Sequence, residues 1–513
     1  MNNPSAFQRK EPVLVRLRHK YRTRYDAAAM LVYLSICFVW GLFAYPVGRD
    51  FAAMADPLAN MARTAAAFFV YEMLLFGDSV MAYRLVNMAL LFGCMAAVYA
   101  FVNFALRGPL WLGILAATLF MANPIHTEAV MNISGAGDLL PAFFALVALA
   151  FYGANVYAPA GRRLLISLMA FTIAVFPFEQ NMFLFLVILL YEYMVPAETS
   201  KYPRRALPFV ILGLIALGVH HGALAAHSWD AAQFAGPLYL ILYPLGFLPE
   251  TVARFHAQPL LGWLAAAAVA GCVYLIHRKA QRSVILFGLL AMLILRLYHD
   301  GRAVDLVHMV GGGQLLVETA LFNLALVALF YRIMDHPKWR PIIVWSTTTL
   351  CIVFFALQIR ATYTWTQAGG AVRAFQAEAR QTAPPDEELG VMPDYQYYQG
   401  APMMLSDSIA HDTPFSDAIA HQPLLPLHYR PADDMTIEIV SWSSTEGRVR
   451  VSGVAPVEVI PRPSDVLAGE WSTDAARVRW EGGEDNSFDL VVTPLDEPLP
   501  ETLLPGGQPG TEE

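Results

Sequence analysis

The segment from 123 to 140 holds the densest group of polar residues in a largely apolar part of the chain. It reads Asn-Pro-Ile-His-Thr-Glu-Ala-Val and continues to Gly-Asp-Leu-Leu, so that it carries His126, Glu128 and Asp138. Polar groups beside membrane segments are costly to bury, so each is a candidate for binding a polar ligand. A structural alternative stays open, in which the segment is a capping loop and Asp138 caps the following helix.

The elements that must position these residues follow from the composition. Of the 513 residues, 57% are hydrophobic and only 15% are charged, and the mean hydropathy is +0.45. Soluble domains usually carry about 25% charged residues. The composition therefore excludes a soluble globular protein and a disordered chain, and it predicts a mostly helical protein with many membrane spans.

Eleven apolar runs predict about eleven transmembrane helices. Eight begin at Asp26, Tyr83, Asp138, Arg205, Pro259, Ser283, Gly313 and Pro341, and three shorter ones cover 109–122, 164–176 and 182–195. A further piece at 237–249 is bounded by prolines, which favours a partial or re-entrant segment. The domain organisation expected from this pattern is a basic cytoplasmic N-terminus at 1–25 and a membrane domain at 26–360.

The distribution of basic residues predicts the orientation. Loops rich in Lys and Arg stay cytoplasmic, and with eleven crossings all the basic loops fall on one side. The polar segment at 123–137, the loop at 47–82 and the C-terminal tail then face outward. We expect an integral protein of a bacterial inner membrane that contacts membrane lipids.

The tail differs from the rest of the chain. From Thr362 onward it has 8 Lys and Arg against 25 Asp and Glu, whereas the remainder has 26 basic and 17 acidic residues. We expect a loop-like linker at 361–434, a small β-rich soluble domain at 435–493 and a disordered end at 494–513. Such an acidic tail would repel nucleic acid, and it could instead bind a protein partner.

Four collinear stretches resemble the TMTC-type transmembrane O-mannosyltransferases, which are GT-C glycosyltransferases. The most specific is Pro-Ile-His-Thr-Glu-Ala-Val from Pro124, followed by Ile-Ser-Gly and Asp-Leu-Leu. Weaker ones are Tyr-Arg-Leu-Val-Asn from Tyr83, Glu179-Gln180 before Leu-Leu-Tyr-Glu, and Leu-Tyr-Pro-Leu-Gly-Phe from Leu242. The resemblance covers roughly residues 26–335, but this chain has no tetratricopeptide repeats, which the family normally carries.

The resemblance implies a GT-C-like fold and a hexosyltransferase that uses a polyprenyl-phosphate sugar as donor. It implies that Asp50, with Asp56 in reserve, is the catalytic base in the first outward loop. Arg63 and His126 would bind the donor phosphate, and Glu128 and Asp138 would order the site. Such a base accepts the proton of the acceptor hydroxyl. The lipid-linked sugar is a substrate, so no cofactor is expected, and a need for a divalent metal stays open.

Several family positions have lost their polar residue. Asn123, Ala136 and Phe178 stand where the family has His, Arg and Lys, and Gly313-Gln314-Leu315 replaces a late Glu-Arg-Tyr. Two functions therefore stay open, namely glycosyl transfer and a catalytically silent scaffold of a larger membrane complex.

Two other clusters of polar residues are weaker candidates for a binding site. Arg296 and Arg302, with His299 and Asp300, lie at the outward end of a span and could bind the donor phosphate in place of the missing basic groups. They could equally anchor the helix at the interface by snorkelling. The paired histidines His220 and His221 point to different faces of a helix, so we expect no metal site.

Overall fold

The computed structural model of the chain has two units. The first comprises residues 1–43 and 61–363, and the second comprises 44–60 and 364–513. Within them the structure describes residues 31–45, 47, 50, 63–77, 79–107, 109–195, 203–222, 279–297, 312–334, 337–382, 391–392, 397–398, 401–402, 425–426, 429–443, 445–456, 468–472, 476–482 and 487–494. The predicted run from Pro259, the segment 237–249, the N-terminus 1–25 and the end 495–513 lie outside these residues.

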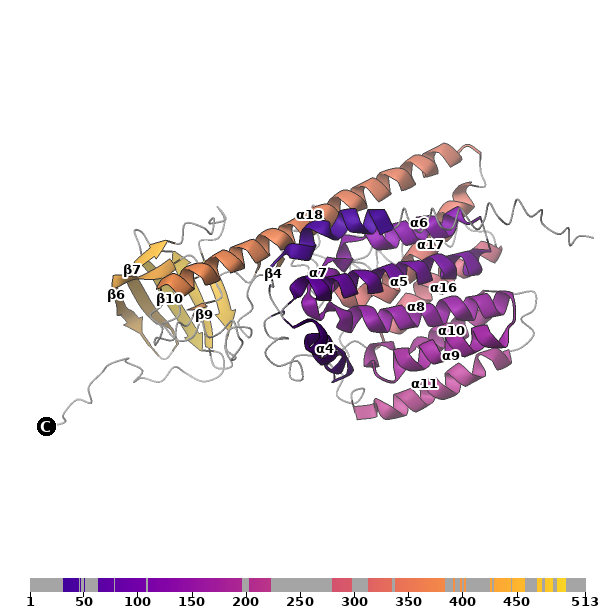
Figure 1. Cartoon of the computed structure of the whole chain (residues 1–513), viewed down its shortest axis with the longest axis horizontal. Coiled ribbons are helices and arrows are strands. Elements are labelled where there is room, and N and C mark those ends of the chain that lie inside the picture. Colours follow the sequence, from indigo (N-terminus) through magenta and orange to yellow (C-terminus); the bar gives the residue numbers. More distant parts are fainter. Residues whose placement is uncertain are drawn as a thin grey trace, which may run out of the picture. The chain divides into compact units, whose positions relative to one another are not determined.

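The first unit is a helix bundle (Figure 1). Its longer helices are α5 (Val80–Leu106), α8 (Ala136–Tyr157), α17 (Leu316–Met334) and the first part of α18 (Arg340–Thr382). Between and around them are α4 (Arg63–Phe76), α6 (Trp111–Ala122), α9 (Gly161–Val175), α10 (Leu184–Met194), α11 (Leu207–Val219) and α16 (Lys279–Leu295). An apolar helix also covers Leu31–Phe43 and ends in the 3₁₀ turn η2 (Val39–Phe43).

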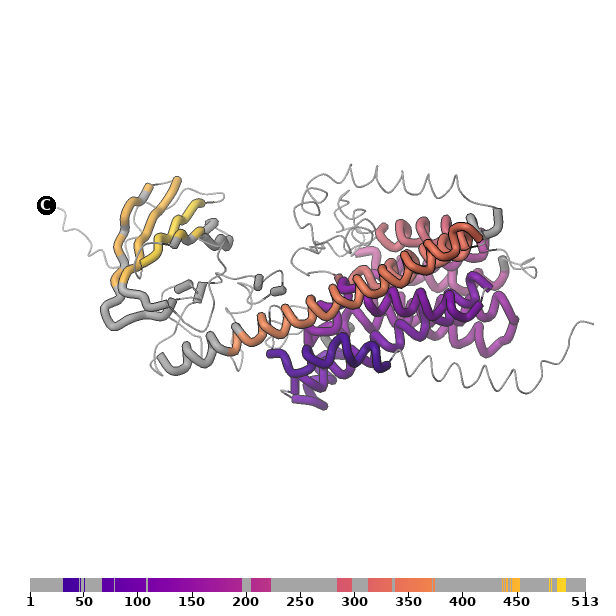
Figure 2. Tube along the Cα trace, turned by 90° about the horizontal axis from the view of Figure 1, so that it is seen from above, coloured from indigo at the N-terminus to yellow at the C-terminus, as the bar shows by residue number. Residues whose placement is uncertain are grey.

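These helices form because Ala, Leu, Phe and Met dominate the runs, and such residues bury apolar surface without losing helix propensity. Helix α5 packs against α6 and α8, α8 packs against α9, and α16 packs against α10 and α17. Figure 2 shows the helix bundle in a view turned by 90°. All the predicted apolar runs except the one from Pro259 coincide with helices of the structure.

Four described segments are long and apolar enough to cross a membrane, namely Val80–Leu106, Ile133–Tyr157, Gly312–Met334 and Arg340–Gly370. The protein is therefore a mostly helical membrane protein with several apolar spans. The count of eleven crossings stays a prediction.

Short 3₁₀ turns join the helices where polar residues gather. They are η3 (Pro124–His126) and η4 (Ile133–Gly135) on either side of the five-residue α7 (Thr127–Met131), η5 (Glu179–Asn181) before α10, η6 (Pro203–Arg205) before α11, and η9 (Gly312–Leu315) before α17. Most of these turns lead directly into a longer helix. They therefore fix the geometry of its first turn.

Two helices lie where the sequence pattern predicted irregular structure. Helix α4 occupies part of the expected outward loop at 47–82, because its run of Ala, Phe and Leu favours a helix. Helix α18 continues to Thr382, so the linker expected to be loop-like from 361 begins with a helix. Its sequence from 371 to 382 is rich in Ala, Arg and Gln, which are strong helix formers.

The second unit contains a five-stranded antiparallel sheet in the order β6-β7-β10-β9-β8. Its strands are β6 (Tyr429–Trp442), β7 (Gly447–Pro456), β8 (Ala468–Ser472), β9 (Ala476–Gly482) and β10 (Ser487–Pro494). Alternating apolar and polar residues in this part of the sequence predict strands at 436–440, 448–451, 477–480 and 488–492. These segments lie in β6, β7, β9 and β10, whereas the alternation does not predict β8. Two small pairs precede the sheet, β2 (Val391–Met392) with β5 (Leu425–Pro426) and β3 (Tyr397–Tyr398) with β4 (Ala401–Pro402).

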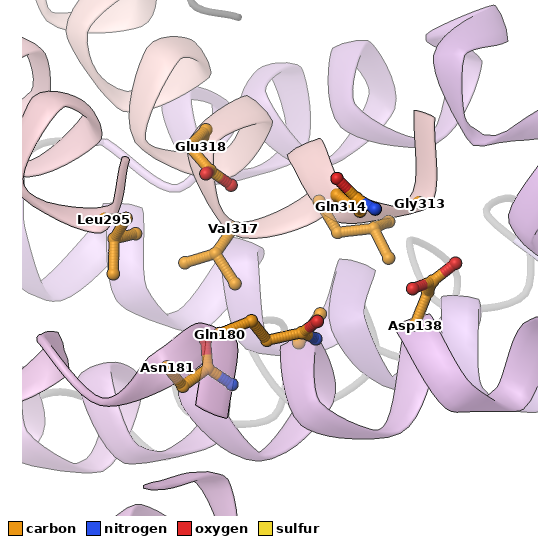
Figure 3. A pocket seen from close by; sticks show the side chains of 10 residues that line it. Asp138, Gln180, Asn181, Leu295, Gly313, Gln314, Val317 and Glu318 are labelled. Carbon is orange, nitrogen blue, oxygen red and sulfur yellow. The ribbon is translucent and has the colours of Figure 1, made fainter. Parts of the chain in front are cut away.

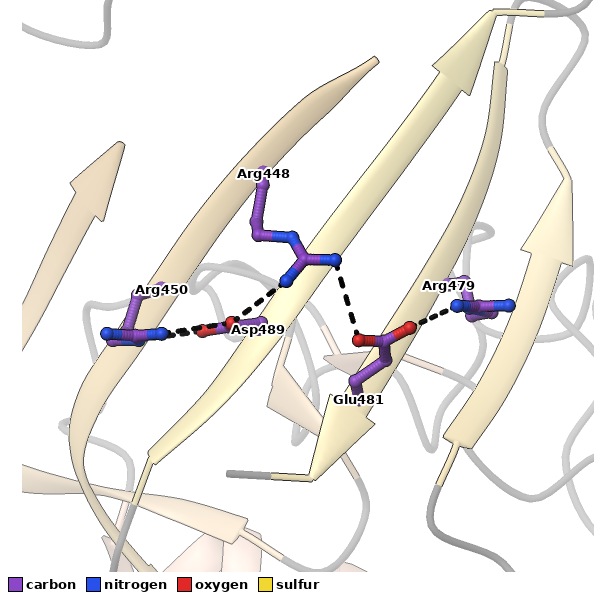
Figure 4. A network of polar contacts seen from close by, with 5 residues as sticks. All are labelled: Arg448, Arg450, Arg479, Glu481 and Asp489. Carbon is purple, nitrogen blue, oxygen red and sulfur yellow. Dashed lines mark hydrogen bonds and ion pairs between the residues drawn. The ribbon is translucent and has the colours of Figure 1, made fainter. Parts of the chain in front are cut away.

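One face of this sheet carries a network of charges (Figure 4). Asp489 accepts hydrogen bonds from Nε and Nη2 of Arg450 at 2.8 and 3.1 Å, and Arg448 lies between Asp489 and Glu481 at 3.8 and 3.6 Å. Glu481 also pairs with Arg479. On the opposite face the cross-strand partners Phe488 and Val451 are buried. The sheet therefore has one charged face and one apolar face.

Candidate functional site

The polar segment after α6 folds into two capped turns. The Asn123 side chain accepts a hydrogen bond from the Ile125 amide at 3.2 Å, which starts η3. The Asn132 side chain accepts hydrogen bonds from the Ser134 amide at 3.1 Å and from its hydroxyl at 2.9 Å, which starts η4. Asparagine caps helices in this way because its oxygen satisfies an otherwise unpaired amide. Both asparagine side chains therefore stabilise the turns that they begin.

Helix α5 holds this segment in place with two buried side chains. The guanidinium of Arg84 donates to the carbonyl oxygens of Met131 at 2.7 Å and Gly41 at 3.0 Å. The amide of Asn87 donates to the carbonyls of Asn132 at 2.7 Å and Val130 at 3.3 Å. Three of these bonds satisfy carbonyl groups at the end of α7 that lack helical partners, and the bond to Gly41 joins α5 to η2. The Tyr-Arg-Leu-Val-Asn stretch thus anchors the polar segment.

His126 is fully buried, and the centroid of its ring lies 4.6 Å from that of Phe120. Burial lowers the pKa of His126 to about 3, so the imidazole is neutral at physiological pH. A neutral imidazole can still donate one hydrogen bond, but it offers a phosphate no positive charge.

Thr127 and Glu128 connect the segment to distant helices. Thr127 Oγ1 accepts a hydrogen bond from Nε2 of Gln358 in α18 at 3.0 Å. Glu128 Oε2 accepts one from the backbone amide of Gly312 at 3.0 Å. The backbone of η9 also comes so close to η3 that a Cβ at Gly312 would overlap the carbonyl oxygen of Ile125. The polar segment, η9 and the first part of α18 therefore pack against one another.

Beside the polar segment and η9 lies a polar pocket (Figure 3). It is formed at the start of α8, at η5, at the end of α16, and at η9 with the start of α17, and its free space has room for about one or two water molecules. Figure 3 shows Gln180 extending from η5 toward Asp138, with Gln314 and Val317 on the facing side. Its polar lining consists of Asp138, Gln180, Asn181, Gln314 and Glu318.

Two contacts fix the lining. Asn181 is 4% exposed, and its Nδ2 donates to the carbonyl of Pro141 in α8 at 3.1 Å. Gly313 lies against Asp138, because a Cβ built on it would overlap the Asp138 carboxylate. The pocket therefore depends on the small residue at 313.

A buried ion pair borders the pocket. Nε of Arg296, just after α16, lies 3.2 Å from Oε1 of Glu318 in the first turn of α17. Their side chains are only 1% and 6% exposed. A buried charge is tolerated only when it is paired or hydrogen-bonded, so each partner requires the other.

Basic residues gather at the opposite end of the helices. Arg107 ends α5, and its guanidinium carbon lies 5.6 Å from the centroid of the Tyr157 ring at the end of α8. Arg163, in the first turn of α9, donates to the carbonyl of Ala158 at 2.6 Å. Arg332 ends α17. The pocket, in contrast, is built from the starts of α8 and α17, so the basic end and the pocket end lie at opposite ends of these helices.

The remaining predicted residues are placed as follows. Asp50 is buried in the second unit, where its Oδ2 accepts a hydrogen bond from the Val47 amide at 3.0 Å. Arg63 is the first residue of α4 in the first unit. Asp56 and Arg302 lie outside the described residues. Of the predicted site residues, Asp138 lines the pocket and Arg296 borders it through Glu318.

Four polar lining residues were not predicted as site residues, namely Gln180, Asn181, Gln314 and Glu318. Glu318 carried a usable signal, because it is an acidic residue within an apolar run. The amides carried a weaker one, since Gln180 occurs in a stretch that resembles the family and Gln314 stands where the family has a late Glu-Arg-Tyr. Within the described part of the chain, no group of three or more His, Cys, Asp or Glu residues could hold a metal ion.

Comparisons with known proteins give a likeness in structure but none in sequence. No family model matches the sequence, and no curated protein matches it. The chain is similar in structure to ArnT from Cupriavidus metallidurans, whose crystal structure is in the apo state, with a TM-score of 0.41 and 12% sequence identity over 79% of this chain and 90% of that chain.

Proposed function

We propose that this protein is a membrane glycosyltransferase that moves a sugar from a polyprenyl-phosphate-type donor to an acceptor at the outer face of the membrane. The observation that carries the proposal is the polar pocket of Asp138, Gln180, Asn181, Gln314 and Glu318 within an apolar helix bundle. Ionisable and amide groups are expensive in such surroundings, and they mark ligand sites by default. The resemblance of the polar segment to sugar transferases supports a sugar as the ligand.

The distribution of charge supports the side of the membrane. The basic ends of α5, α9 and α17 carry Arg107, Arg163 and Arg332. Basic helix ends stay in the cytoplasm. The pocket at the other end of these helices would then open toward the outer face, with the N-terminus cytoplasmic and the C-terminal sheet outside.

The proposed reaction is a substitution at the anomeric carbon of the donor. The bond from this carbon to the phosphate oxygen breaks, and polyprenyl phosphate leaves with the bonding electrons. The acceptor oxygen forms the new glycosidic bond, and a carboxylate takes its proton. No oxidant or reductant is required.

The roles of individual residues are part of the proposal. Asp50, with Asp56 in reserve, acts as the base. Arg63 binds the donor phosphate as a cation, with Arg296 and Arg302 as further basic groups. His126 contributes a neutral hydrogen bond, and Glu128 orders the site through its bond to Gly312. Asp138 orders the pocket itself.

The experiment is gentle detergent extraction of the tagged full-length protein from its native membrane, beside the Asp50→Asn variant. Mass spectrometry would identify the copurified lipids, and the glycoconjugates of the two membranes would be compared. We expect a polyprenyl-phosphate lipid with both proteins and a glycan product that is lost in the variant, because removing a general base lowers rates by about 10²–10⁴-fold.

The matched control is Glu446→Gln, which changes an exposed carboxylate in the turn between β6 and β7. It should keep the glycan product at the wild-type level. A product that persists in Asp50→Asn would contradict the role of Asp50. The absence of both the lipid and a glycan difference would contradict glycosyl transfer.

A scaffold function is the second candidate, and one observation favours it. Arg84, Asn87, Thr127 and Glu128, which lie in the family-like stretches, all bond to groups within the protein. Such residues could persist for structural reasons alone. The same experiment separates the two functions, because a scaffold should copurify with stoichiometric protein partners that are unchanged by Asp50→Asn.

A further inference from the structure

We infer that a separate site at the basic end of the helix bundle binds the head group of a phospholipid that carries a phosphate and a primary ammonium, namely a phosphatidylethanolamine. The site consists of Tyr152 near the end of α8, Glu192 in the last turn of α10, and Arg205 just before α11. This inference goes beyond the proposed function and does not depend on it.

Aromatic packing brings the three residues together. The centroid of the Tyr152 ring lies 5.2 Å from that of Phe209 in α11 and 6.0 Å from that of Tyr191 in α10. Glu192 directly follows Tyr191, and Arg205 comes shortly before Phe209. The Tyr152 hydroxyl donates a hydrogen bond to Oε2 of Glu192 at 3.0 Å, and the charge of Arg205 also acts on this hydroxyl. A carboxylate and a guanidinium therefore lie near the same hydroxyl group.

Each of the two charged groups has a buried atom that makes no hydrogen bond. In the part of the chain that the structure describes, Oε1 of Glu192 and Nη1 of Arg205 are buried and have no hydrogen-bond partner. A buried donor or acceptor without a partner is costly, and such groups are rare in folded proteins. A ligand that offers both a donor to Glu192 and an acceptor to Arg205 would remove both costs.

The helix dipoles do not explain why these charges are here. A carboxylate is disfavoured in the last turn of a helix, where Glu192 lies, and a cation is disfavoured at a helix start, where Arg205 lies. Asp138 and Glu318, in contrast, lie in the first turns of α8 and α17, where carboxylates are favoured. A bound group of complementary charge would offset the unfavourable placement of Glu192 and Arg205.

The chemistry of the two groups selects the head group. The phosphate of phosphatidylethanolamine can accept from Nη1 of Arg205, and its primary ammonium can donate to Oε1 of Glu192. Phosphatidylglycerol offers a phosphate but no cation, so the carboxylate of Glu192 would disfavour it. Phosphatidylcholine carries a cation without N–H groups, which cannot donate to the carboxylate. A phosphate joined to a primary ammonium satisfies both groups.

The surface beside the site fits the acyl chains of a lipid. Leu189 and Tyr193 of α10 and Leu207 and Ile211 of α11 are exposed, and the two helices pack against each other. Tyrosine is enriched where a membrane protein meets the head groups. The exposed apolar residues extend from the site along both helices, so a membrane lipid fits this surface better than a free phosphoethanolamine does.

The experiment is native mass spectrometry of the full-length protein in detergent, titrated with phosphatidylethanolamine, phosphatidylcholine or phosphatidylglycerol that share the same acyl chains. We expect the wild type to bind phosphatidylethanolamine about tenfold more tightly than the other two, as expected for one additional hydrogen bond to a charged group. Glu192→Gln and Arg205→Gln should each weaken this binding about tenfold. Glycerophosphoethanolamine, which lacks acyl chains, should bind far more weakly than the lipid.

The matched control is Arg204→Gln, which removes the same charge from the exposed neighbour of Arg205. It should keep the preference for phosphatidylethanolamine. If Glu192→Gln does not fold, N-methylated forms of phosphatidylethanolamine replace it, and the affinity of the wild type should fall as N–H groups are lost.

Four results would overturn the inference. They are equal affinity for the three lipids, tightest binding of phosphatidylglycerol, an unchanged preference in both site variants, and an affinity for glycerophosphoethanolamine equal to that for the lipid. None of these measurements depends on a glycan product, so their outcome is separate from that of the test with Asp50→Asn.

Discussion

The backbone amide of Gly312 donates a hydrogen bond to the carboxylate of Glu128 at 3.0 Å, although the two residues are far apart in the sequence. This bond joins η9 to the polar segment, and the absence of a side chain at Gly312 permits it, because a Cβ would overlap the Ile125 carbonyl oxygen. The start of α17, which lines the pocket, is thereby fixed to the polar segment beside it.

We predict that Gly312→Ala destabilises the protein, because the backbone of η9 must move away from η3. Moving it also breaks the bond to Glu128, and a hydrogen bond to a charged group contributes about 1.5–3 kcal/mol. The measurement is the Tm of the full-length protein in detergent. Gly218→Ala in α11 is the control, since a Cβ there meets open space. It should leave the Tm unchanged or raise it slightly.

A second substitution addresses the pocket alone. Gly313→Ala places a methyl group against the Asp138 carboxylate. We expect it to displace Asp138 and to lower the Tm, whereas Gly370→Ala, at an open position of α18, should not. The Tm of the full-length protein in detergent measures both. An unchanged Tm in Gly313→Ala would show that the Asp138 carboxylate can move aside without cost to the fold.

The sequence predicted the elements better than the site. Apolar runs locate helices because each span buries its own hydrophobic residues, and alternation located β6, β7, β9 and β10 for the same reason. The pocket follows from tertiary packing instead. Gln180, Gln314 and Asp138 come from three segments that are far apart in the sequence. No local sequence pattern indicates that η5, η9 and α8 lie side by side at one pocket. Asp138 itself fits both a cap and a ligand group, and only the packing of Gly313 against it favours a place in the pocket.

Local helix propensity explains why the first part of the predicted linker is helical. The expected linker from 361 was interpreted as irregular from its Pro, Asp and Tyr content, which lies mostly beyond residue 383. The first part has no proline and continues α18 to Thr382. The helix could have been recognised from the Ala, Gln and Arg residues of that stretch.

The sheet should respond to acid through Asp489. Hydrogen bonds from Arg450 hold the pKa of Asp489 below its ordinary value of 3.8, and the nearby charges of Arg450 and Arg448 act in the same direction. Because the folded-state pKa is the lower one, the stabilisation is fully present above the ordinary pKa and is lost as the pH falls through the folded value. We expect the amides of β7 and β10 to lose protection, relative to their intrinsic exchange rates, below about pH 4, the region of an ordinary Asp pKa. In Asp489→Asn this acid-dependent step should be smaller, whereas Glu446→Gln should keep it.

The ion pair of Arg296 and Glu318 should show strong coupling, because both side chains are almost fully buried. Removing one partner leaves the other charge without its counterion, which typically costs about 3–5 kcal/mol. We therefore expect Arg296→Met and Glu318→Leu each to lower the Tm sharply, and the double variant to lose less than the two single losses added together. A double-mutant cycle on the Tm in detergent measures this. Additive losses would show that the two residues are stabilised by separate neighbours. This result would favour the proposed role of Arg296 as a ligand of the donor phosphate.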